Sequence, residues 1–516
     1  MMASLFLSRV LGVARDATMS GMFGSNIETD AYRLAFQVPD LLFFLVAGGA
    51  LSSAFIPVFS EYFHTDREED AWKVFSVVAS VMSLAVLAFI AFAWVFAEPL
   101  ARLVAPGKPD HLFPIIAQMS RIVLPAQFAF FLGGLMFGTL YSRNLFAVPG
   151  LGPNVYNLGI IFGAVAISWF VTPAVAGMSW GALIGAFVGN FFLPLWAMRR
   201  LGSRFSFSLD LSHPGVKRVF RLMVPVALGL SLPGVYGFII MAFGSFYGAG
   251  VVTWLDYANR LMQAPLGVFG QSLAIAVFPT LARHFAQKEM GLYRAELSKT
   301  LRAVLYIAVP VSALMFVLAP EIVAVLYQHG RFLPKDTVGV AWLLQLFSIG
   351  VFAWCLHPVL MRGFFAVQDS LTPIVLGTVT SVVFVGLVLG LRQTELGAGS
   401  LPLASSIAAV LLAALLTVAA GRRIGGLDVA GILRTLGSSL FATLLSAGFA
   451  LVAVMWVRGW ADLGQKVPAG VAALLIGLGA AWLYYAVTKA LGMPETNFVS
   501  KALSRNPKPP NPPKES

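Results

Sequence analysis

Six arginine residues lie inside stretches of about 20 otherwise apolar residues, and they are the side chains in this sequence best suited to bind a ligand. A guanidinium stays charged and offers a planar fork of N–H donors, which matches the oxygens of phosphate and carboxylate groups. Placing one against lipid costs about 2.5–3.5 kcal/mol on the insertion scale. Most of them must therefore face protein or water, and we predict a chamber that binds an anionic group such as a diphosphate. The six are Arg9, Arg15, Arg33, Arg121, Arg260 and Arg362.

The position of each arginine within its stretch separates two expectations. Arg15, Arg121 and Arg260 lie seven or more residues inside, so we expect them to face the chamber. Arg33 lies at the outer boundary of its stretch and Arg362 near an inner end. For these two, snorkelling to the interface or a structural ion pair is an alternative.

Carboxylates near these stretches are too few, and mostly too close to the ends, to neutralise every arginine. Arg15 and Asp16 are adjacent, so on a helix we expect them to diverge rather than to pair. The sequence therefore predicts an excess of positive charge in the chamber. The candidate partners are Asp16, Asp30, Asp40, Asp256 and Asp369.

The rest of the sequence offers no constellation for catalysis, metal binding or cofactor binding. The six histidines lie mostly in or near loops without the spacing of metal ligands, and no nucleotide-binding glycine motif occurs. The single cysteine, Cys355, excludes a disulfide framework. We expect a protein that is not an enzyme, with no metal and no cofactor, while coupling to the membrane potential or to an ion stays open.

Composition indicates which elements position these arginines. The chain has 58% hydrophobic and 11% charged residues, against about 25% charged in soluble domains. We predict an all-helical integral membrane protein with about 14 spans. Internal Pro and Gly residues, such as Pro39, Pro125 and Pro265, indicate breaks that line a cavity. The spans are 3–25, 31–60, 74–98, 112–141, 150–171, 176–198, 222–246, 253–282, 303–326, 338–365, 372–391, 400–420, 435–457 and 468–488.

Loop charge predicts the orientation. Alternate loops hold most of the Lys and Arg residues outside the spans, and such loops stay on the cytoplasmic side. Both termini should therefore be cytoplasmic. The formal net charge of +12 then needs no nucleic-acid partner, because a basic inner surface against anionic lipid accounts for it.

An internal repeat divides the spans into two groups of six. Because six is even, both halves should share one orientation and be related by a pseudo-two-fold axis along the membrane normal, around a central cavity. Three pairs of segments match at an offset near 224 residues: Glu98…Gly107-Lys108 with Glu321…Gly330-Arg331, Gly138…Pro149 with Gly363…Pro373, and Gln37-x-Pro39 with Gln263-x-Pro265.

The repeat leads to four predicted regions. Residues 1–210 form an N-lobe of helices 1–6, and residues 211–425 form a C-lobe of helices 7–12. Residues 426–492 add helices 13 and 14, an apolar groove suited to a long lipid tail. Residues 493–516 are Pro-rich and polar, which predicts a disordered cytoplasmic tail.

Several motifs, in the same order along nearly the whole chain, resemble the lipid II flippase family, known as MurJ or MviN. The motifs are Ser8-Arg9-Val-Leu-Gly-Val-Ala-Arg15-Asp16, Thr29-Asp30-Ala31, Ala47-Gly-Gly-Ala-Leu-Ser-Ser-Ala-Phe-Ile-Pro57, Ala105-Pro-Gly107, Pro153-x-x-x-Asn157, Ala258-Asn259-Arg260-Leu-Met, Gln328-His-Gly330-Arg-Phe332 and Gln368-Asp369-x-x-Thr372-Pro373.

The resemblance implies a transporter of the multidrug/oligosaccharidyl-lipid/polysaccharide exporter superfamily that works by alternating access. The substrate would be lipid II, undecaprenyl-diphosphate-linked disaccharide-pentapeptide, moved from the inner to the outer leaflet of a bacterial cytoplasmic membrane for peptidoglycan synthesis and cell shape. Arg9, Arg15, Arg260 and Asp30 match the family's functional cavity charges. The last two helices would guide the lipid tail.

The chain also departs from the family's pattern. Some relatives carry an Arg pair and a Glu where this chain has Phe43, Phe44 and Gly48, and an Asp where it has Asn259. Arg33 and Arg362 are additional. Residues 372–383 lack the acidic and amide side chains with which some members bind sodium.

The predicted substrate-binding residues are therefore Arg9, Arg15, Asp30, Arg260, Arg121, Arg362, Arg33 and Asn259. The expected partners are lipid II and membrane lipids, and we expect a monomer. Three alternatives stay open: a related polysaccharide-lipid flippase, a cation or drug antiporter of the same superfamily, and a polyprenyl-phosphate transferase. An antiporter would need intramembrane carboxylates, and a transferase would need paired acidic residues or a large outer loop.

Overall fold

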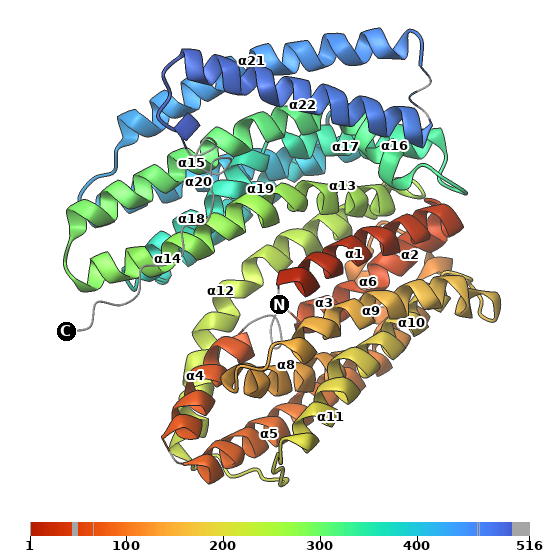
Figure 1. The fold of residues 1–516 in the computed structure, drawn as a ribbon. Helices are drawn as coiled ribbons and strands as arrows, with labels where there is room; N and C mark the ends of the chain where they lie inside the picture. Colours follow the sequence, from red (N-terminus) through yellow and green to blue (C-terminus); the bar gives the residue numbers. More distant parts are fainter. Residues whose placement is uncertain (1, 44–49, 66, 462, 464, 498–516) are drawn as a thin grey trace. The chain divides into compact units, whose positions relative to one another are not determined.

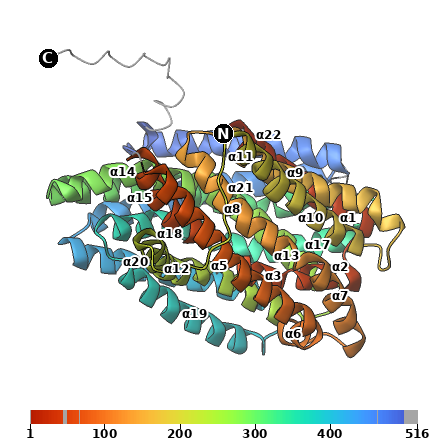
Figure 2. The ribbon, with the colours of Figure 1, turned by 90° about the horizontal axis from the view of Figure 1, so that it is seen from below.

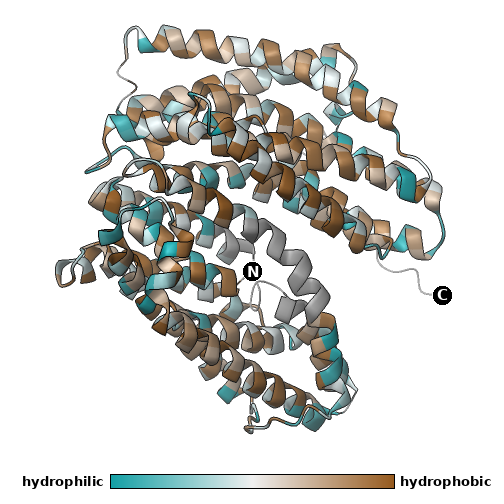
Figure 3. Cartoon of the chain, turned by 180° about the vertical axis from the view of Figure 1, so that it is seen from behind, coloured by the Kyte–Doolittle hydropathy of each residue, from teal (hydrophilic) through white to brown (hydrophobic). Residues whose placement is uncertain are grey.

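The computed structural model describes residues 2–43, 50–65, 67–461, 463 and 465–497. Across these ranges every regular element is a helix, and no strand occurs. Apolar residues cover much of the helices and polar residues gather toward the ends and connections (Figure 3). Such a distribution is that of helices that face lipid. The chain forms two compact units, Met1–Tyr257 with Leu326–Val340 and Arg392–Leu401, and Ala258–Val325 with Ala341–Leu391 and Pro402–Ser516.

The first unit contains the N-terminal helices (Figure 1). They are α1 (Met2–Phe23), α2 (Ile27–Ala35), α3 (Gln37–Leu42), α4 (Ala50–His64), α5 (Glu68–Val95), α6 (Ala97–Val104), the 3-10 helix η2 (Asp110–Leu112), α7 (Phe113–Val123), α8 (Ala126–Ser142), α9 (Ala147–Val165), the 3-10 helix η3 (Ile167–Trp169), α10 (Ala176–Ala186), the π-helix η4 (Phe187–Phe192), α11 (Leu193–Arg200) and α12 (Pro214–Gly244).

Small residues allow α9 and α10 of this unit to pack closely, side by side in both views (Figures 1 and 2). A Cβ on Gly159 would lie 2.6 Å from Gly185 Cα, and one on Gly181 would lie 2.8 Å from Gly163 Cα. The backbones therefore touch where side chains would separate them, which is the usual way that helices associate in membranes.

The second unit contains the π-helix η5 (Leu266–Gly270), α14 (Gln271–Ala286), α15 (Met290–Val317), α18 (Val351–Ala366), α19 (Leu371–Leu391), α21 (Val429–Arg458) and α22 (Lys466–Ala490). The 3-10 helix η6 (Gly397–Gly399) belongs to the first unit. Four helices begin in one unit and end in the other: α13 (Val251–Pro265), α16 (Ala319–Tyr327), α17 (Pro334–Ser348) and α20 (Ser400–Ile424).

Helices α21 and α22 lie side by side in the second unit and pack on α15 (Figure 1). Tyr484 of α22 donates from its hydroxyl to Tyr306 O at 2.7 Å and approaches Ser439 Oγ of α21 at 3.1 Å. Thr488 Oγ1 lies 3.1 Å from the Tyr306 hydroxyl. Buried hydroxyls that satisfy one another join three helices here.

Eleven of the fourteen predicted spans correspond to helices with the length and composition to cross a membrane. Ten helices or helix runs qualify on their own, and the pair α17 and α18, bent by 49°, forms the eleventh, counting only described residues. The predicted spans 3–25, 31–60 and 222–246, which overlap α1, α2 to α4 and α12, are not among these eleven. The second contains residues 44–49, which lie outside the described residues.

Predicted proline breaks appear in the helices. Pro125 separates α7 from α8, and Pro265 is followed by the π-turn η5. Pro57 and Pro279, in contrast, lie inside α4 and α14. A proline removes one N–H and displaces the preceding turn, so a change of helix type after it is expected.

The internal repeat is visible in the element order. The 28-residue helix α5 is followed by the eight-residue α6, and the 28-residue α15 is followed by the nine-residue α16. Glu98 and Glu321 occupy the first turns of these two short helices. The repeat therefore specifies the same local structure twice.

Two expectations differ from the structure. Helix α12 clusters with the N-terminal helices, where it packs on α4, rather than with the region beginning at residue 211. The predicted disorder from residue 493 is wrong for 493–497, because Met493 and Glu495 are buried. Glu495 accepts from Thr435 Oγ1 at 3.0 Å and lies 3.6 Å from Arg302 Nε, which anchors this segment. Residues 498–516 lie outside the described residues.

Candidate functional site

A chain of four alternating charges lies in the first unit. Arg15 of α1 binds Asp16, which lies 3.5 Å from Arg33 of α2, and Arg33 binds Asp256 of α13 at 3.0 Å. The guanidinium of Arg33 also lies over the ring of Tyr257, 5.2 Å from its centroid. Arg33 is therefore a buried structural cation, 7% exposed, whose charge is balanced from both sides.

Arg15 is the more accessible end of this chain of charges. Its Nε and Nη2 donate to Asp16 Oδ1 at 3.1 and 3.0 Å, so the expectation that the two side chains diverge is wrong. The arginine side chain is long enough to reach around the helix to the neighbouring residue. Nη1 donates to Asn157 Oδ1 at 3.1 Å, and Asn157 in turn donates to Ser8 O at 3.3 Å. The motif residue Asn157 therefore orients Arg15 and ties α9 to α1.

Asp30 occupies a second, fully buried charge site in the first unit. Its carboxylate accepts from Lys108 Nζ at 2.8 Å, from Gly250 N and Thr253 N at 2.9 Å each, and from Thr253 Oγ1 at 2.9 Å. Both N–H groups belong to the start of α13, so Asp30 caps this helix from α2 and meets its positive end. All partners of the carboxylate are supplied by the protein in this structure. Its predicted role in binding substrate stays a prediction.

Two glycines of the internal repeat make reciprocal contacts within the first unit. Gly107 follows α6, and its N–H donates to Ser245 Oγ, just beyond α12, at 2.9 Å. Gly330 follows α16, and its Cα position faces Gly21 near the end of α1, where Arg331 N donates to Gly21 O at 2.8 Å. The glycine of each half thus meets the first helix of the other half. The segment 326–340 belongs to the first unit because of these contacts.

Thr29 and Thr253 mark the centre of this reciprocal arrangement. Their hydroxyls lie 3.1 Å apart, and their numbers differ by 224, which is the offset of the repeat. Positions equivalent in the two halves can touch only near a two-fold axis. The Thr29–Thr253 contact is of the kind expected near such an axis, and the pseudo-two-fold relation of the two halves stays a prediction.

The remaining predicted residues are dispersed. Arg9 lies on an exposed face of α1, and no ion-pair partner for it occurs among the described residues. Arg260 is exposed and Asn259 half-buried on α13. Arg362, in the second unit, lies over the ring of Phe278 at 5.1 Å.

Arg121, whose predicted role in the chamber stays a prediction, contacts the end of α5. Its Nε donates to Trp94 O at 3.0 Å, and its guanidinium lies 5.3 Å from the centre of the Trp94 ring. Trp94 belongs to the last turn of α5, where carbonyl groups lack partners within the helix. Arg121 therefore supplies a donor to a helix end beside an exposed tryptophan, which is the environment of a membrane interface.

The two repeated glutamates have different partners. Glu98 pairs with Arg102 one turn later at 3.3 Å, near the surface. Glu321 has Val325 at the equivalent position, and it binds Arg458 at the end of α21 at 2.6 Å. Its side chain is 1% exposed. Glu98 therefore forms a local ion pair, whereas Glu321 forms an ion pair that attaches α21 to the second unit.

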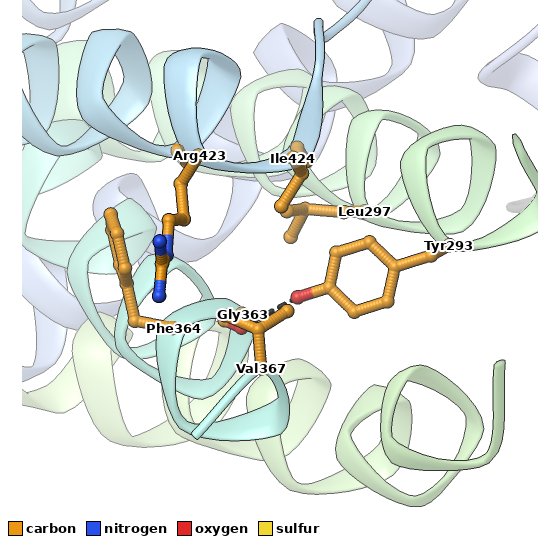
Figure 4. Close-up of a pocket in the computed structure, with 8 residues that line it drawn as sticks. Tyr293, Leu297, Gly363, Phe364, Val367, Arg423 and Ile424 are labelled. Carbon is orange, nitrogen blue, oxygen red and sulfur yellow. Dashed lines mark hydrogen bonds between the residues drawn. The ribbon is translucent and has the colours of Figure 1, made fainter. Parts of the chain in front are cut away.

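A small hollow in the second unit lies between α15, α18 and the end of α20 (Figure 4). Its empty volume is about 170 Å³, and the Tyr293 hydroxyl donates to Gly363 O at 2.5 Å along its wall. The hollow contains none of the predicted binding residues, and it is too small for a lipid-linked sugar.

Sequence reasoning missed Lys108 as the partner of Asp30. The signal was present, because a basic residue follows the glycine in both copies of the repeat, Lys108 after Gly107 and Arg331 after Gly330. It also missed Thr253 and the role of Arg458. A hydroxyl and a loop arginine are too common in sequences to single out without contacts.

A helical protein with at least ten membrane-spanning candidates, an internal repeat and charges buried among its helices is a polytopic membrane transporter by architecture. The comparisons with known proteins specify the family. The family model described as "Lipid II flippase MurJ" matches residues 19–467, and the chain belongs to this family.

Individual relatives agree with this assignment. The lipid II flippase MurJ of Burkholderia cenocepacia is 30% identical over 377 residues, covering 71% of this chain and 72% of that protein. A solved structure of a lipid II flippase MurJ in an inward closed conformation has a TM-score of 0.79 at 22% identity, covering 95% of this chain and 99% of that one. An inward-facing multidrug resistance transporter of the MATE family has a TM-score of 0.68 at 14% identity, covering 81% and 94%. The structural likenesses show the shared fold.

Proposed function

We propose that this protein moves lipid II from the inner to the outer leaflet of a bacterial cytoplasmic membrane by alternating access, with both termini in the cytoplasm. Membership of the MurJ family over residues 19–467 supports this proposal. The observation that carries it in the structure is the pair of guanidinium groups on α1. Arg9 is exposed and Arg15 is accessible at one edge, so both can reach the oxygens of a diphosphate.

Binding at Arg15 requires exchange of one anion for another. In the structure Asp16 holds Arg15, and the same carboxylate lies near Arg33. When a diphosphate takes Arg15, Asp16 keeps Arg33 as its cation, so no buried charge loses its last partner. The barrier to exchange is therefore lower than for an isolated buried ion pair.

Release on the other side requires the contacts around Asp30 to separate. The hydrogen bonds from Gly250 N and Thr253 N to Asp30, the Thr29–Thr253 contact and the Gly21–Gly330 contact all join the two halves of the repeat. These contacts lie where the predicted orientation places the outer face. We propose that they form while the headgroup enters from inside and break when it leaves outside. Arg260 and Asn259, on the same helix as Thr253, stay predicted substrate-binding residues.

Helices α21 and α22 are proposed to guide the polyprenyl tail, because exposed apolar side chains such as Leu444 and Leu475 line them. We further propose that the protein acts as a monomer, without cofactor or metal, and that the membrane potential or an ion drives it. A diphosphate carries negative charge, so its movement outward is favoured by a potential that is positive outside.

The experiment is leaflet-resolved detection of labelled lipid II in cells depleted of their own flippase and supplied with this protein. We expect Arg9→Ala and Arg260→Ala to lose complementation and outer-leaflet lipid II at unchanged protein levels. Lys335→Ala, which removes an exposed cation elsewhere, is the matched control and should complement. Full activity of both arginine variants contradicts the proposal.

A cation or drug antiporter is the second candidate, because the fold resembles a MATE transporter. Such a protein needs carboxylates that can exchange protons, sodium or cationic drugs. Asp16, Asp30 and Asp256 are each paired with a protein cation here, which favours the anionic substrate. Drug efflux by the wild type, in the absence of lipid II transport, would favour the antiporter.

A further inference from the structure

The connection between α11 and α12 carries a row of exposed apolar side chains outside the predicted spans. Residues 204–211 alternate between polar or charged residues and large apolar ones. The apolar members are Phe205, Phe207, Leu209 and Leu211, whose exposed fractions are 59%, 65%, 50% and 50%. Each would gain about 1.5–3 kcal/mol on full burial, so a row of four needs a partner.

This segment is fastened along α5 rather than free. Ser206 N donates to Ser76 Oγ at 3.1 Å, and Ser208 N donates to Ser80 Oγ at 3.2 Å. Because Ser76 and Ser80 are one helical turn apart, the segment runs along the helix as it leaves α11. The alternation then directs Phe205, Phe207 and Leu209 together, away from Ser206 and Ser208.

Both ends of the segment are tied to the first turn of α5. Arg143 donates to Leu201 O at 3.1 Å and to Glu68 Oε1 at 3.2 Å. His213 Nε2 lies 3.6 Å from Asp70 Oδ1 on the returning side. The segment is therefore a loop that enters alongside α5 and comes back, held at both ends and in the middle.

The depth of the loop can be estimated from α5. Lys73 is the last charged residue of this helix, and Ser76 and Ser80 follow it by three and seven residues. At about 1.5 Å per residue they lie roughly 4.5 and 10 Å further along. The polar region of one leaflet is about 5–7 Å thick, so the loop spans from the headgroups to the edge of the hydrocarbon.

The residues around the loop are consistent with this depth in the membrane. Trp196, near the end of α11, is half exposed, and the Arg200 guanidinium lies 4.0 Å from its ring centre. Tryptophan under an arginine is typical of a membrane interface. Arg199, Arg200 and Arg204 flank the loop and are all exposed. Such a basic cluster attracts anionic headgroups, at about 1 kcal/mol per residue.

From these observations we propose that residues 203–211 form a membrane anchor. Phe205, Phe207, Leu209 and Leu211 insert into the interfacial region of the leaflet on the basic side, and Arg199, Arg200 and Arg204 bind phosphates of anionic phospholipids. The anchor holds the loop between α11 and α12, which connects the two halves of the repeat, at the bilayer surface. The occupant of the apolar row is thus lipid and not a protein.

The test places spin labels on single cysteines in the full chain, with the buried native Cys355 replaced by alanine. Labels at 205, 207 and 209 are compared with labels at Ser206 and Ser212, the matched polar positions, in nanodiscs. We expect the ratio of collisions with oxygen to collisions with a water-soluble nickel chelate to be several-fold higher at the apolar positions. Equal ratios at all five positions overturn the anchor, and spin–spin broadening between two copies would assign the row to a dimer contact instead.

A second measurement tests the basic cluster. The difference in collision ratio between apolar and polar label positions should be larger in nanodiscs of phosphatidylglycerol than in nanodiscs of phosphatidylcholine. In the triple variant R199Q, R200Q and R204Q, the collision ratios should still differ between apolar and polar label positions. The size of that difference should no longer depend on the lipid. An equal contrast in both lipids for the unsubstituted cluster overturns the binding of anionic headgroups.

Discussion

Arg15 and Arg33 approach the same oxygen, Asp16 Oδ1, at 3.0 and 3.5 Å. One carboxylate therefore serves two guanidinium groups, and Asp256 supplies the second negative charge through Arg33. The four groups are neutral in sum, yet they are not equivalent, because Arg15 is 14% exposed and Arg33 is 7% exposed. Arg15 is the member that can be released to a ligand, and Arg33 is the member that keeps Asp16 in place.

The first prediction concerns Arg33 as a positioning residue. Arg33→Met should lower the thermal stability of the purified protein, because Asp256 loses the guanidinium group 3.0 Å away, and breaking such pairs costs about 3–5 kcal/mol. Asp16 then no longer shares its charge with Arg33, which should strengthen its hold on Arg15 and slow lipid II transport.

The double variant Arg33→Met with Asp256→Asn separates these effects. It removes both charges, so thermal stability should return toward that of the wild type while transport stays slow. Recovery of transport together with stability would show that Arg33 acts only on folding.

The second prediction is a double-mutant cycle at Asp30 and Lys108. Lys108→Met leaves a fully buried carboxylate with only neutral donors, and we expect a loss of about 3–5 kcal/mol. Asp30→Asn should cost less, because the amide oxygen still accepts from Thr253 N. The double variant should be more stable than Lys108→Met, as measured by thermal unfolding in detergent. Additive losses would contradict a direct interaction.

Much of this fold could be predicted from the sequence, because few backbone structures can span a bilayer. Apolar runs of sufficient length must be helices, and the repeat specified α5 with α6 and α15 with α16 as equivalent pairs. The helices over predicted spans such as 372–391 follow from composition alone. These features depend on local sequence and on the solvent.

The partners of the buried charges could not be predicted in the same way. Arg15 and Asp16 pair although their positions on a helix diverge, since the arginine side chain is flexible. Lys108 reaches Asp30 across 78 residues, and Arg458 reaches Glu321 across 137. Such pairs depend on tertiary packing, which one sequence does not display.

The third prediction concerns the close approach of Gly330 and Gly21. Gly330 has φ of +58°, and a Cβ there would overlap the Gly21 carbonyl oxygen. Gly330→Ala should therefore weaken the contact between the halves, lower the melting temperature and increase protease cleavage near residue 330. Gly291→Ala is the control, because a Cβ on Gly291 meets nothing within 4 Å and the residue is helical. Equal behaviour of the two variants would refute the importance of this contact.

The fourth prediction is a pH dependence at Asp369, which precedes α19. Burial raises the pKa of this carboxyl, but hydrogen bonds from Thr372 and the charge of Arg423 outweigh it and hold the pKa below its usual value. The carboxylate thus stabilises the folded state above the unfolded pKa of about 3.9, and this contribution is lost as the pH falls through the lower folded pKa. Asp369→Asn should lower the melting temperature at neutral pH, and its difference from the wild type should shrink below about pH 4. A constant difference at all pH values would exclude this origin.

The fifth prediction concerns the attachment of α21 and α22 through Arg458 and Glu321. Glu321 is 1% exposed and Arg458 is 47% exposed, so the pair lies at the edge of the second unit. Arg458→Ala leaves the buried carboxylate without its cation, and we expect a loss near the lower end of about 3–5 kcal/mol, because water can enter at the arginine side.

Glu321→Gln with Arg458→Ala should recover part of this loss, since a neutral amide needs no cation. If α21 and α22 guide the lipid tail, Arg458→Ala should reduce lipid II transport by more than the loss of folded protein at the assay temperature explains. Transport by the double variant should also remain slow. Arg102→Ala is the matched control, because its pair with Glu98 is exposed and surface ion pairs contribute little to stability. Wild-type transport by Arg458→Ala would show that the docking of these two helices at Glu321 is dispensable.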